Sequence, residues 1–270
     1  MNILKLIESF TNEGMLKSLS DKTSRRDSFS QFGKIGAGAA IAAVPFGMLF
    51  SSNKATAQTA TAATAKSALQ LALTLEYLED EFYQMGLDAN GLIPSADQTY
   101  IAQVSQHEAA HVAFLSQALG ADAPAKPTFD FTMGGQLDTF TNYQTFLAVA
   151  QAFEDTGVRA YKGQAGNLMS NGDLLTAALQ IHSVEARHAS QIRRMRGNKG
   201  WITGNNGGNM PGFTQPVYDG EQNTTQGGAN ITTLSATNGP ALTLNGATES
   251  FDEILTGDQA VTIASLFIVP

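Results

Sequence analysis

Cysteine is absent from this chain of 270 residues. Its absence excludes a disulfide framework, a thiolate metal site and a cysteine nucleophile. The sequence also lacks a long apolar run: the apolar stretch at residues 35–50 has 16 residues and is interrupted by glycines and Pro45, whereas a membrane span needs about 20. No phosphate-binding loop, serine-hydrolase elbow or dinucleotide fingerprint occurs in the sequence. At this length, the chain is able to bury a sizeable core without covalent cross-links.

Residues 1–57 have the layout of a bacterial export signal. The Arg25-Arg26 pair precedes the apolar stretch, and the small-x-small pattern Ala55-x-Ala57 follows it. The arginine pair and the weak hydrophobicity resemble the twin-arginine type of signal. That resemblance implies export of an already folded protein, often with its cofactor loaded, to the periplasm or the extracellular space. The alternative is an N-terminal membrane anchor that stays attached.

Basic residues are scarce after residue 57. Residues 1–57 carry seven Lys and Arg and four Asp and Glu, whereas the remainder carries nine and twenty. Such an acidic protein is a poor match for nucleic acid or for an anionic membrane surface. We therefore expect no nucleic-acid partner and no stable membrane insertion after signal cleavage.

Four helices are predicted between residues 60 and 197, because apolar residues recur there at helical spacing and turn residues separate the runs. The first and third links are short, which favours antiparallel neighbours, and the middle link of about twenty residues favours a crossover. The sequence therefore predicts an all-α four-helix bundle with one long crossover. The expected helices are Ala65–Leu87, Asp97–Leu119, Thr141–Met169 and Asp173–Arg196.

A different composition begins after the fourth helix. Residues 198–250 are rich in Gly, Asn and Thr, which predicts that residues 198–270 form an irregular C-terminal extension packed on the bundle. The segment ALTLNG, residues 241–246, alternates in hydrophobicity and suggests one or two strands. Thr256 and Gln259 form a capping-box pattern, which predicts a short final helix from Asp258 to Phe267.

A repeated pattern of glutamate, tyrosine and histidine runs through the four helices. The second and fourth helices each carry Glu-x-x-His, and the first and third each carry Glu-x6-Tyr. The spacings place both residues of each pattern on one helix face. The pattern thus occurs twice in the same order. Its members are Glu76 and Tyr83, Glu108 and His111, Glu154 and Tyr161, and Glu185 and His188.

Four inward carboxylates would repel one another and would be costly to bury without counter-charge. Two divalent metal ions neutralise them and also use the two imidazoles, which is the ligand set of di-iron and di-manganese carboxylate bundles. Oxygen and imidazole ligands suit iron, manganese or zinc. We therefore expect two iron or manganese ions, with zinc as a third candidate.

The segments LEYLEDEFY, HEAAHVAFL, FEDTGVRAY and HSVEARHA resemble the helix motifs of the ferritin-like superfamily, and ESFDEILT resembles its C-terminal segment. The closest likeness is to exported bacterial ferritin-like domain proteins related to plant desiccation-related proteins. The resemblance implies that Glu108 and Glu185 bridge two metal ions and that Glu76 and Glu154 are outer ligands. It further implies that one histidine holds each metal and that the tyrosines are second-shell donors or redox-active phenols. Those histidines are His111 and His188, and those tyrosines are Tyr83 and Tyr161.

Other side chains are alternatives to this set. Glu79 is a second candidate for the outer ligand, but it has no tyrosine seven residues on, so we interpret it as a rim or second-shell residue. His107 and His182 adjoin the motifs and fit a helix surface or a second shell better than direct ligation. Asp80 and Asp155 are candidates to orient the histidines, or are solvated helix positions.

Two classes of function fit these residues. In the first, the metal ions act on oxygen or peroxide as an oxidase, peroxidase or catalase-like enzyme. In the second, the protein is a non-catalytic extracytoplasmic stress or desiccation-related protein with a structural or vestigial metal site. A storage cage fits less well, because its shell would have to accommodate the long C-terminal extension. The sequence does not set the oligomeric state.

Overall fold

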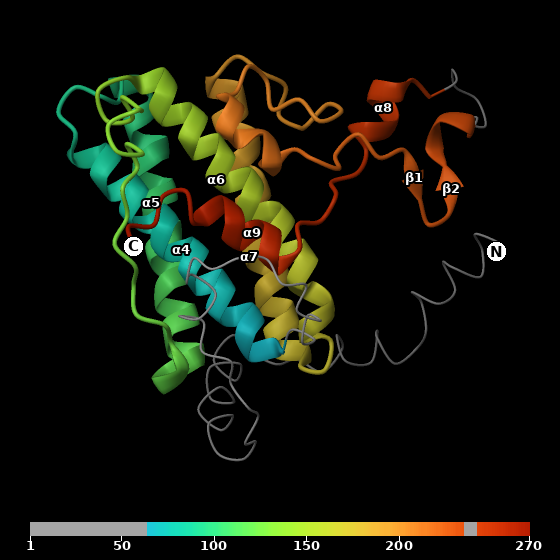
Figure 1. The fold of residues 1–270 in the computed structure, drawn as a ribbon, viewed down its shortest axis with the longest axis horizontal. Helices are drawn as coiled ribbons and strands as arrows, with labels where there is room; N and C mark the ends of the chain where they lie inside the picture. Colours follow the sequence, from blue (N-terminus) through green and yellow to red (C-terminus); the bar gives the residue numbers. More distant parts are fainter. Residues whose placement is uncertain (1–63, 235–241) are drawn as a thin grey trace. The chain divides into compact units, whose positions relative to one another are not determined.

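The computed structural model describes residues 64–234 and 242–270, and the predicted export signal lies outside them. Two pairs of long helices form the bundle (Figure 1). They are α4 (Ala65–Asp88), α5 (Ser95–Leu119), α6 (Tyr143–Gln164) and α7 (Gly172–Met195). None of the helices in the described ranges has the length and apolar character needed to cross a membrane.

Local capping determines where the bundle helices begin. Thr64 and Ser67 form a capping box at the start of α4, and Asn142 and Asn171 cap α6 and α7 with their side-chain oxygens. The helix α5 instead starts after Pro94, whose fixed φ suits a helix entrance. The third helix is shorter than predicted: α6 ends at Gln164, and a 3₁₀ turn, η3 (Ala165–Leu168), continues the chain.

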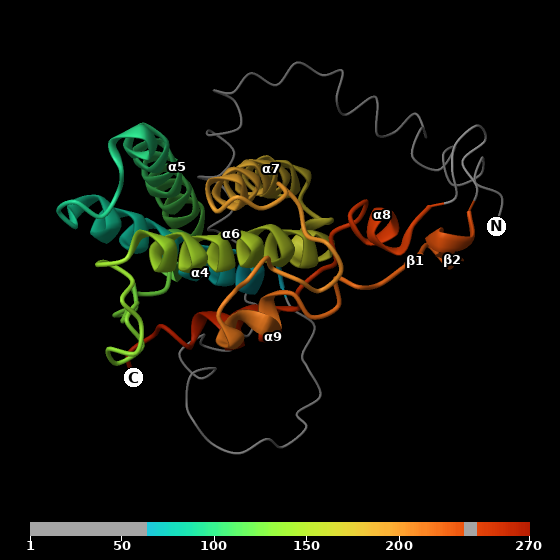
Figure 2. The same cartoon turned by 90° about the horizontal axis from the view of Figure 1, so that it is seen from above.

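The helices pack as α4 with α5 and as α6 with α7, and α4 and α6 join the two pairs. In Figure 2, α5 and α7 lie on one side of the α4–α6 layer, and α9 (Gly257–Ala264) lies on the other. The long link between α5 and α6 confirms the predicted crossover. It packs Phe131 edge-on against Phe82 at 5.3 Å, so the crossover contributes to the core.

The C-terminal extension is mostly irregular, as predicted, but ALTLNG is not a strand. Leu244–Thr248 is the short helix α8, because Thr243 caps it by accepting a hydrogen bond from the Gly246 amide. The only paired strands in the described residues are β1 (Thr225–Gln226) and β2 (Ala229–Asn230), which form an antiparallel ribbon. The predicted capping box of Thr256 and Gln259 is present and starts α9. The remaining elements are the 3₁₀ turns η2 (Gly120–Asp122), η4 (Gly212–Val217) and η5 (Ile231–Thr233).

A buried arginine fastens the extension to α6. Arg159 is 1% exposed and pairs with Glu221 at 2.8 Å between Nε and Oε1. Its guanidinium also donates to backbone carbonyls of two separate parts of the extension, including that of Asp219 at 2.9 Å and that of Glu253 at 3.0 Å. Because a guanidinium satisfies several acceptors at once, this one side chain organises an otherwise irregular segment.

A second buried ion pair lies between α6 and α7. Asp155 pairs with Arg193 and accepts a hydrogen bond from the Tyr218 hydroxyl at 2.9 Å. Gln151 donates to Tyr218 at 2.9 Å and to the Gly207 carbonyl at 2.6 Å. Asp155 therefore holds the extension and α7 on α6; it does not orient a histidine of the repeated pattern, and it is not a solvated position.

Candidate metal centre

Each of the four long helices contributes one glutamate of the repeated pattern to a single buried cluster. All four carboxylates are fully buried, and the two Glu-x-x-His histidines join them. The ligand atoms form two overlapping groups, each within 4.8 Å. The first group is Glu76, Glu108, His111 and Glu185; the second is Glu108, Glu154, Glu185 and His188.

The overlap of the two groups separates the carboxylates into two kinds. Glu108 and Glu185 belong to both groups, whereas Glu76 and Glu154 each belong to one. This is the arrangement that two neighbouring ions require, with two shared carboxylates and one outer carboxylate for each ion. The structure thus brings together all six residues for which the sequence predicts a metal role.

Each histidine aims Nδ1 at three carboxylates. Nδ1 of His111 lies 3.1 Å from Glu76, 3.1 Å from Glu108 and 3.0 Å from Glu185. One ring nitrogen carries at most one proton, so it cannot donate a good hydrogen bond to all three oxygens. Atoms bound to one ion at about 2.1 Å and at right angles lie about 3 Å apart, which matches this convergence.

The second histidine has the same surroundings. Nδ1 of His188 lies 2.9 Å from Glu108, 3.3 Å from Glu154 and 3.3 Å from Glu185. One buried oxygen of each of these three glutamates lies close to a histidine Nδ1 but receives no well-directed hydrogen bond in the part of the chain described here. Since buried polar atoms are normally satisfied, carboxylate oxygens that converge in this way without directed hydrogen bonds fit a cation. The residues present therefore fit two metal ions.

The two tyrosines connect α4 and α6 by reciprocal hydrogen bonds. Tyr161 donates to Glu76 at 2.5 Å, and Tyr83 donates to Glu154. The helices α4 and α6 run in opposite directions. The tyrosine of each helix, seven residues after its glutamate, therefore lies beside the outer glutamate of the other helix. By donating these hydrogen bonds, the hydroxyls fix the orientation of both outer carboxylates.

Burial and mutual charge alter proton binding throughout the cluster. Burial, with the charge of Glu185, raises the pKa of Glu108 to about 7, and burial raises the pKa of Glu154 to about 8. Burial also acts to raise the pKa of Glu185, but hydrogen bonds from the two histidines outweigh it and lower this pKa to about 2. Burial alone would lower the pKa of His111 and of His188. The surrounding carboxylates outweigh this effect, so the pKa of each histidine is raised. Without metal, protons supply the positive charge that ions would bring.

Comparison with known proteins shows the family to which this bundle belongs. The model of the ferritin-like domain family matches residues 64–198, half of the chain. The chain belongs to the ferritin-like domain family. A search of curated proteins gives no match. The matched residues span α4 to α7, so the ferritin-like domain contains every residue of the cluster.

Of the two positions expected for Glu79, at the rim or behind the ligands, the structure excludes the rim. Glu79 is only 2% exposed, because Ile263 and Ala264 of α9 line the same small cavity and cover it. Its place in the repeat corresponds to Gly157 on α6, and a Cβ there would lie 3.4 Å from the Glu79 carboxylate. The ferritin-like domain thus holds a fifth buried glutamate, but Glu76 is the one that converges with the histidine.

Burial and the neighbouring carboxylates, Glu185 foremost, raise the pKa of Glu79 well above its usual value. Glu79 is therefore a neighbour of the cluster that binds its proton more tightly than an exposed glutamate does.

The remaining candidates occupy different positions in the ferritin-like domain. Nδ1 of His107 lies 2.9 Å from Nε2 of His188, so His107 supports that ring from behind. His182 instead lies against the backbone carbonyl of Val158 at 3.0 Å. Asp80 is partly buried on α4, and no hydrogen bond or ion pair joins it to a histidine in the described residues. Only His107, of these three, acts on the cluster.

Proposed function

We propose that this protein is an exported di-metal protein that binds two iron or manganese ions and uses them in redox chemistry on oxygen or peroxide. The observation that carries the proposal is the pair of overlapping ligand groups that share Glu108 and Glu185. Oxygen and imidazole ligands of this kind favour iron or manganese, with zinc as the non-redox alternative.

When bound, the ions would supply the redox chemistry on oxygen or peroxide. The chain would contribute position and shielding. Tyr83 and Tyr161 hold the outer carboxylates, and His107 holds the ring of His188. The carboxylates are fully buried, so bulk water is kept from the site.

The proposal that the protein is exported rests on the sequence. The Arg25-Arg26 pair, the interrupted apolar stretch and the Ala55-x-Ala57 pattern support a twin-arginine signal and a periplasmic or extracellular location. A ferritin-like domain with a metal centre is a suitable cargo, because that route carries folded proteins.

Turnover measurements on the metal-loaded protein test the proposal. We would measure oxygen consumption with ferrous ion and hydrogen peroxide loss with the iron and manganese forms. We expect turnover that Glu108→Ala abolishes and that Glu81→Ala retains, because Glu81 lies outside the cluster.

A metal-bound protein without turnover, destabilised by chelation, would contradict the enzymatic part of the proposal. It would favour instead the non-catalytic stress or desiccation-related function with a structural metal site.

A further inference from the structure

A row of aromatic rings connects an outer glutamate of the metal cluster to the surface of the bundle. Tyr83 donates a hydrogen bond to Glu154, and its ring lies edge-to-face with Phe146, at 6.2 Å between ring centroids. Phe146 in turn stacks on Tyr143, at 6.1 Å and with 15° between the ring planes. Tyr83 and Phe146 are fully buried, whereas Tyr143 is partly exposed at the start of α6. We call Tyr83, Phe146 and Tyr143 the aromatic path.

Both phenols of the aromatic path donate a hydrogen bond to a carboxylate. The partner of Tyr83 is Glu154, and the partner of Tyr143 is Asp97, at 2.9 Å between Oη and Oδ2. Burial and the Asp97 carboxylate raise the pKa of Tyr143, so this phenol keeps its proton at neutral pH. An oxidised phenol is a strong acid, and a carboxylate already in hydrogen-bond contact accepts its proton as the electron leaves. Each phenol of the path therefore has a place for the proton that oxidation releases.

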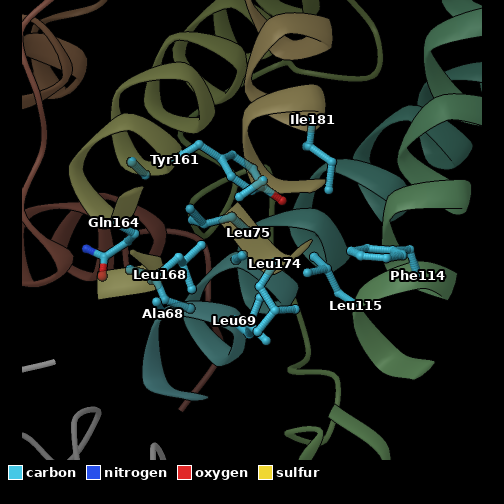
Figure 3. A pocket seen from close by; sticks show the side chains of 14 residues that line it. Ala68, Leu69, Leu75, Phe114, Leu115, Tyr161, Gln164, Leu168, Leu174 and Ile181 are labelled. Atoms are coloured by element: carbon cyan, nitrogen blue, oxygen red, sulfur yellow. The ribbon is translucent and has the colours of Figure 1, made fainter. Parts of the chain in front are cut away.

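The reciprocal tyrosine has different surroundings. Tyr161 donates to Glu76 at 2.5 Å, but its ring lies among mostly aliphatic side chains, which include Leu75 and Ile181 (Figure 3). The two outer glutamates thus have equivalent tyrosines on the side of the cluster. Away from the cluster, the ring of Tyr83 continues into aromatic rings and the ring of Tyr161 into aliphatic side chains.

The burial of the cluster gives such a connection a use. The four carboxylates of the repeated pattern are fully buried, so an electron donor as large as a phenol does not reach them directly. Electrons cross packed aromatic rings where molecules do not pass, and the two phenols of the aromatic path are rings that can be oxidised in turn. Tyr143 is the place on the path where a donor of that size can make contact.

We propose that Tyr143 is a surface site at which uncharged phenols act as one-electron donors to the metal centre, through Tyr83 and Phe146. The proposal rests on the proposed function, because it supplies the electrons that reduction of peroxide consumes. One electron leaves Tyr143 for the oxidised metal centre, and the phenolic proton passes to Asp97 and on to solvent. The external phenol then returns a hydrogen atom to Tyr143. Two such rounds, with two protons from solvent, reduce one hydrogen peroxide to two waters and leave two phenoxyl radicals.

The class of donor follows from the chemistry of Tyr143. Transfer of a hydrogen atom between two phenols breaks and forms the same kind of O–H bond, so its net cost is small. The carboxylate of Asp97 lies beside the Tyr143 hydroxyl and disfavours anionic donors by charge repulsion. An uncharged phenol therefore fits this site best.

Electron paramagnetic resonance of the full chain tests the aromatic path. The protein is loaded with iron, or in parallel with manganese, then mixed with hydrogen peroxide and frozen. We expect a phenoxyl signal that narrows when the tyrosines carry ring deuterium and that added guaiacol, an uncharged phenol, quenches. Tyr143→Phe should lose the quenchable signal and the oxidation of guaiacol. It should keep its metal content, because Tyr143 lies outside the ligand groups and the substitution retains the stacked ring.

Matched substitutions locate the site. Tyr77→Phe removes a hydroxyl outside the aromatic path and should behave as the unaltered protein does. Tyr100 also lies near Tyr83, but its hydroxyl donates to the backbone carbonyl of His188 at 3.5 Å and not to a carboxylate, so Tyr100→Phe should keep the quenchable signal. Asp97→Asn still accepts the hydrogen bond but takes up a proton poorly, so it should slow guaiacol oxidation at unchanged metal content.

Each contrary result has a separate meaning. A metal-loaded protein that consumes oxygen or peroxide but gives no quenchable signal would overturn the role of Tyr143 and leave the proposed function standing. A quenchable signal that is unchanged in Tyr143→Phe, or lost in Tyr100→Phe, would assign the electron route to other residues and would also overturn that role. A protein that binds no metal, or that consumes neither oxygen nor peroxide, would overturn the proposed function and, with it, the use of the aromatic path.

Discussion

The helix pairs α4–α5 and α6–α7 carry the same metal-ligand pattern, but the residues around that pattern differ. Corresponding positions supply Glu76 and Glu154 to the cluster, and their tyrosines cross reciprocally. Three residues after each glutamate, however, α4 has the buried Glu79 and α6 has Gly157. The shared positions are those the cluster needs, and the differing positions reflect what covers each helix.

The C-terminal extension accounts for most of the difference. It lies on α6 through Arg159, whose counterpart on α4 is Glu81, in a partly exposed ion pair with Lys126. The same repeat position is thus a buried anchor in one half and a surface residue in the other. Four predictions test this comparison, from the largest expected effect to the smallest.

The anchor should give the largest effect on stability. Arg159→Met removes the partner of Glu221 and leaves a buried carboxylate uncompensated, so the free energy of unfolding should fall by about 3–5 kcal/mol. Glu81→Met breaks only a partly exposed pair and should cost less than about 1 kcal/mol. Denaturant unfolding of both variants measures the difference, and equal losses would contradict the assignment of Arg159 as the anchor.

The reciprocal tyrosines should have equal effects on metal affinity. Tyr161→Phe frees Glu76, and Tyr83→Phe frees Glu154, so each should weaken the binding of one ion by about 10–100-fold. Chelator competition measures the affinities, with Tyr77→Phe as the control because Tyr77 lies outside the cluster. A loss in only one tyrosine variant would break the proposed equivalence of the two halves.

The supporting histidine should make the two ions unequal. His107 contacts the ring of His188, so His107→Ala should weaken the binding of one ion by about tenfold and leave the ion at His111 tightly bound. Stepwise removal with a chelator should then show one loose and one tight ion, whereas His182→Ala should resemble the unaltered protein. An equal loss of affinity for both ions would contradict the role of His107 in holding the ring of His188.

The smallest expected effect is a dependence on pH. As the pH rises, the stability of the metal-free protein and its affinity for metal should change in opposite directions. The folded metal-free protein keeps Glu108 and Glu154 protonated up to about pH 7 and about pH 8, above the values for an unfolded chain. The folded state then binds more protons than the unfolded state between the unfolded and the folded pKa values, so its stability should fall from about pH 5 to about pH 8. Metal binding requires deprotonated ligands, so metal affinity should rise over the same range.

Denaturant midpoints at the two ends of this pH range measure how the stability of the metal-free protein changes. The variant Glu154→Gln should reduce the slope of the metal-free protein, whereas Glu81→Gln should not. A metal-free protein that becomes more stable with rising pH would contradict the raised pKa values.

Sequence spacing predicted the six clustering residues because helical periodicity determines which residues share a face. It placed Tyr83 on the face of Glu76, but the partner of Tyr83 is Glu154, since that contact depends on how antiparallel helices meet. His107 was left undecided because its partner His188 is 81 residues away.

The errors lie where distant segments decide the environment. A rim position was one of the two expected for Glu79, because the pattern within α4 does not show that α9 covers it. In ALTLNG, alternation suggested a strand, but the cap at Thr243 starts a helix, so a local hydrogen bond outweighed the hydrophobic pattern.

Elemental analysis of the purified full chain, before and after anaerobic addition of ferrous or manganous ion, is the most direct test of the di-metal centre. The account predicts about two ions per chain, and none in the double variant Glu108→Ala/Glu185→Ala, which loses both shared carboxylates. A chain that takes up no metal after reconstitution, or a double variant that binds as much as the unaltered protein, would contradict it.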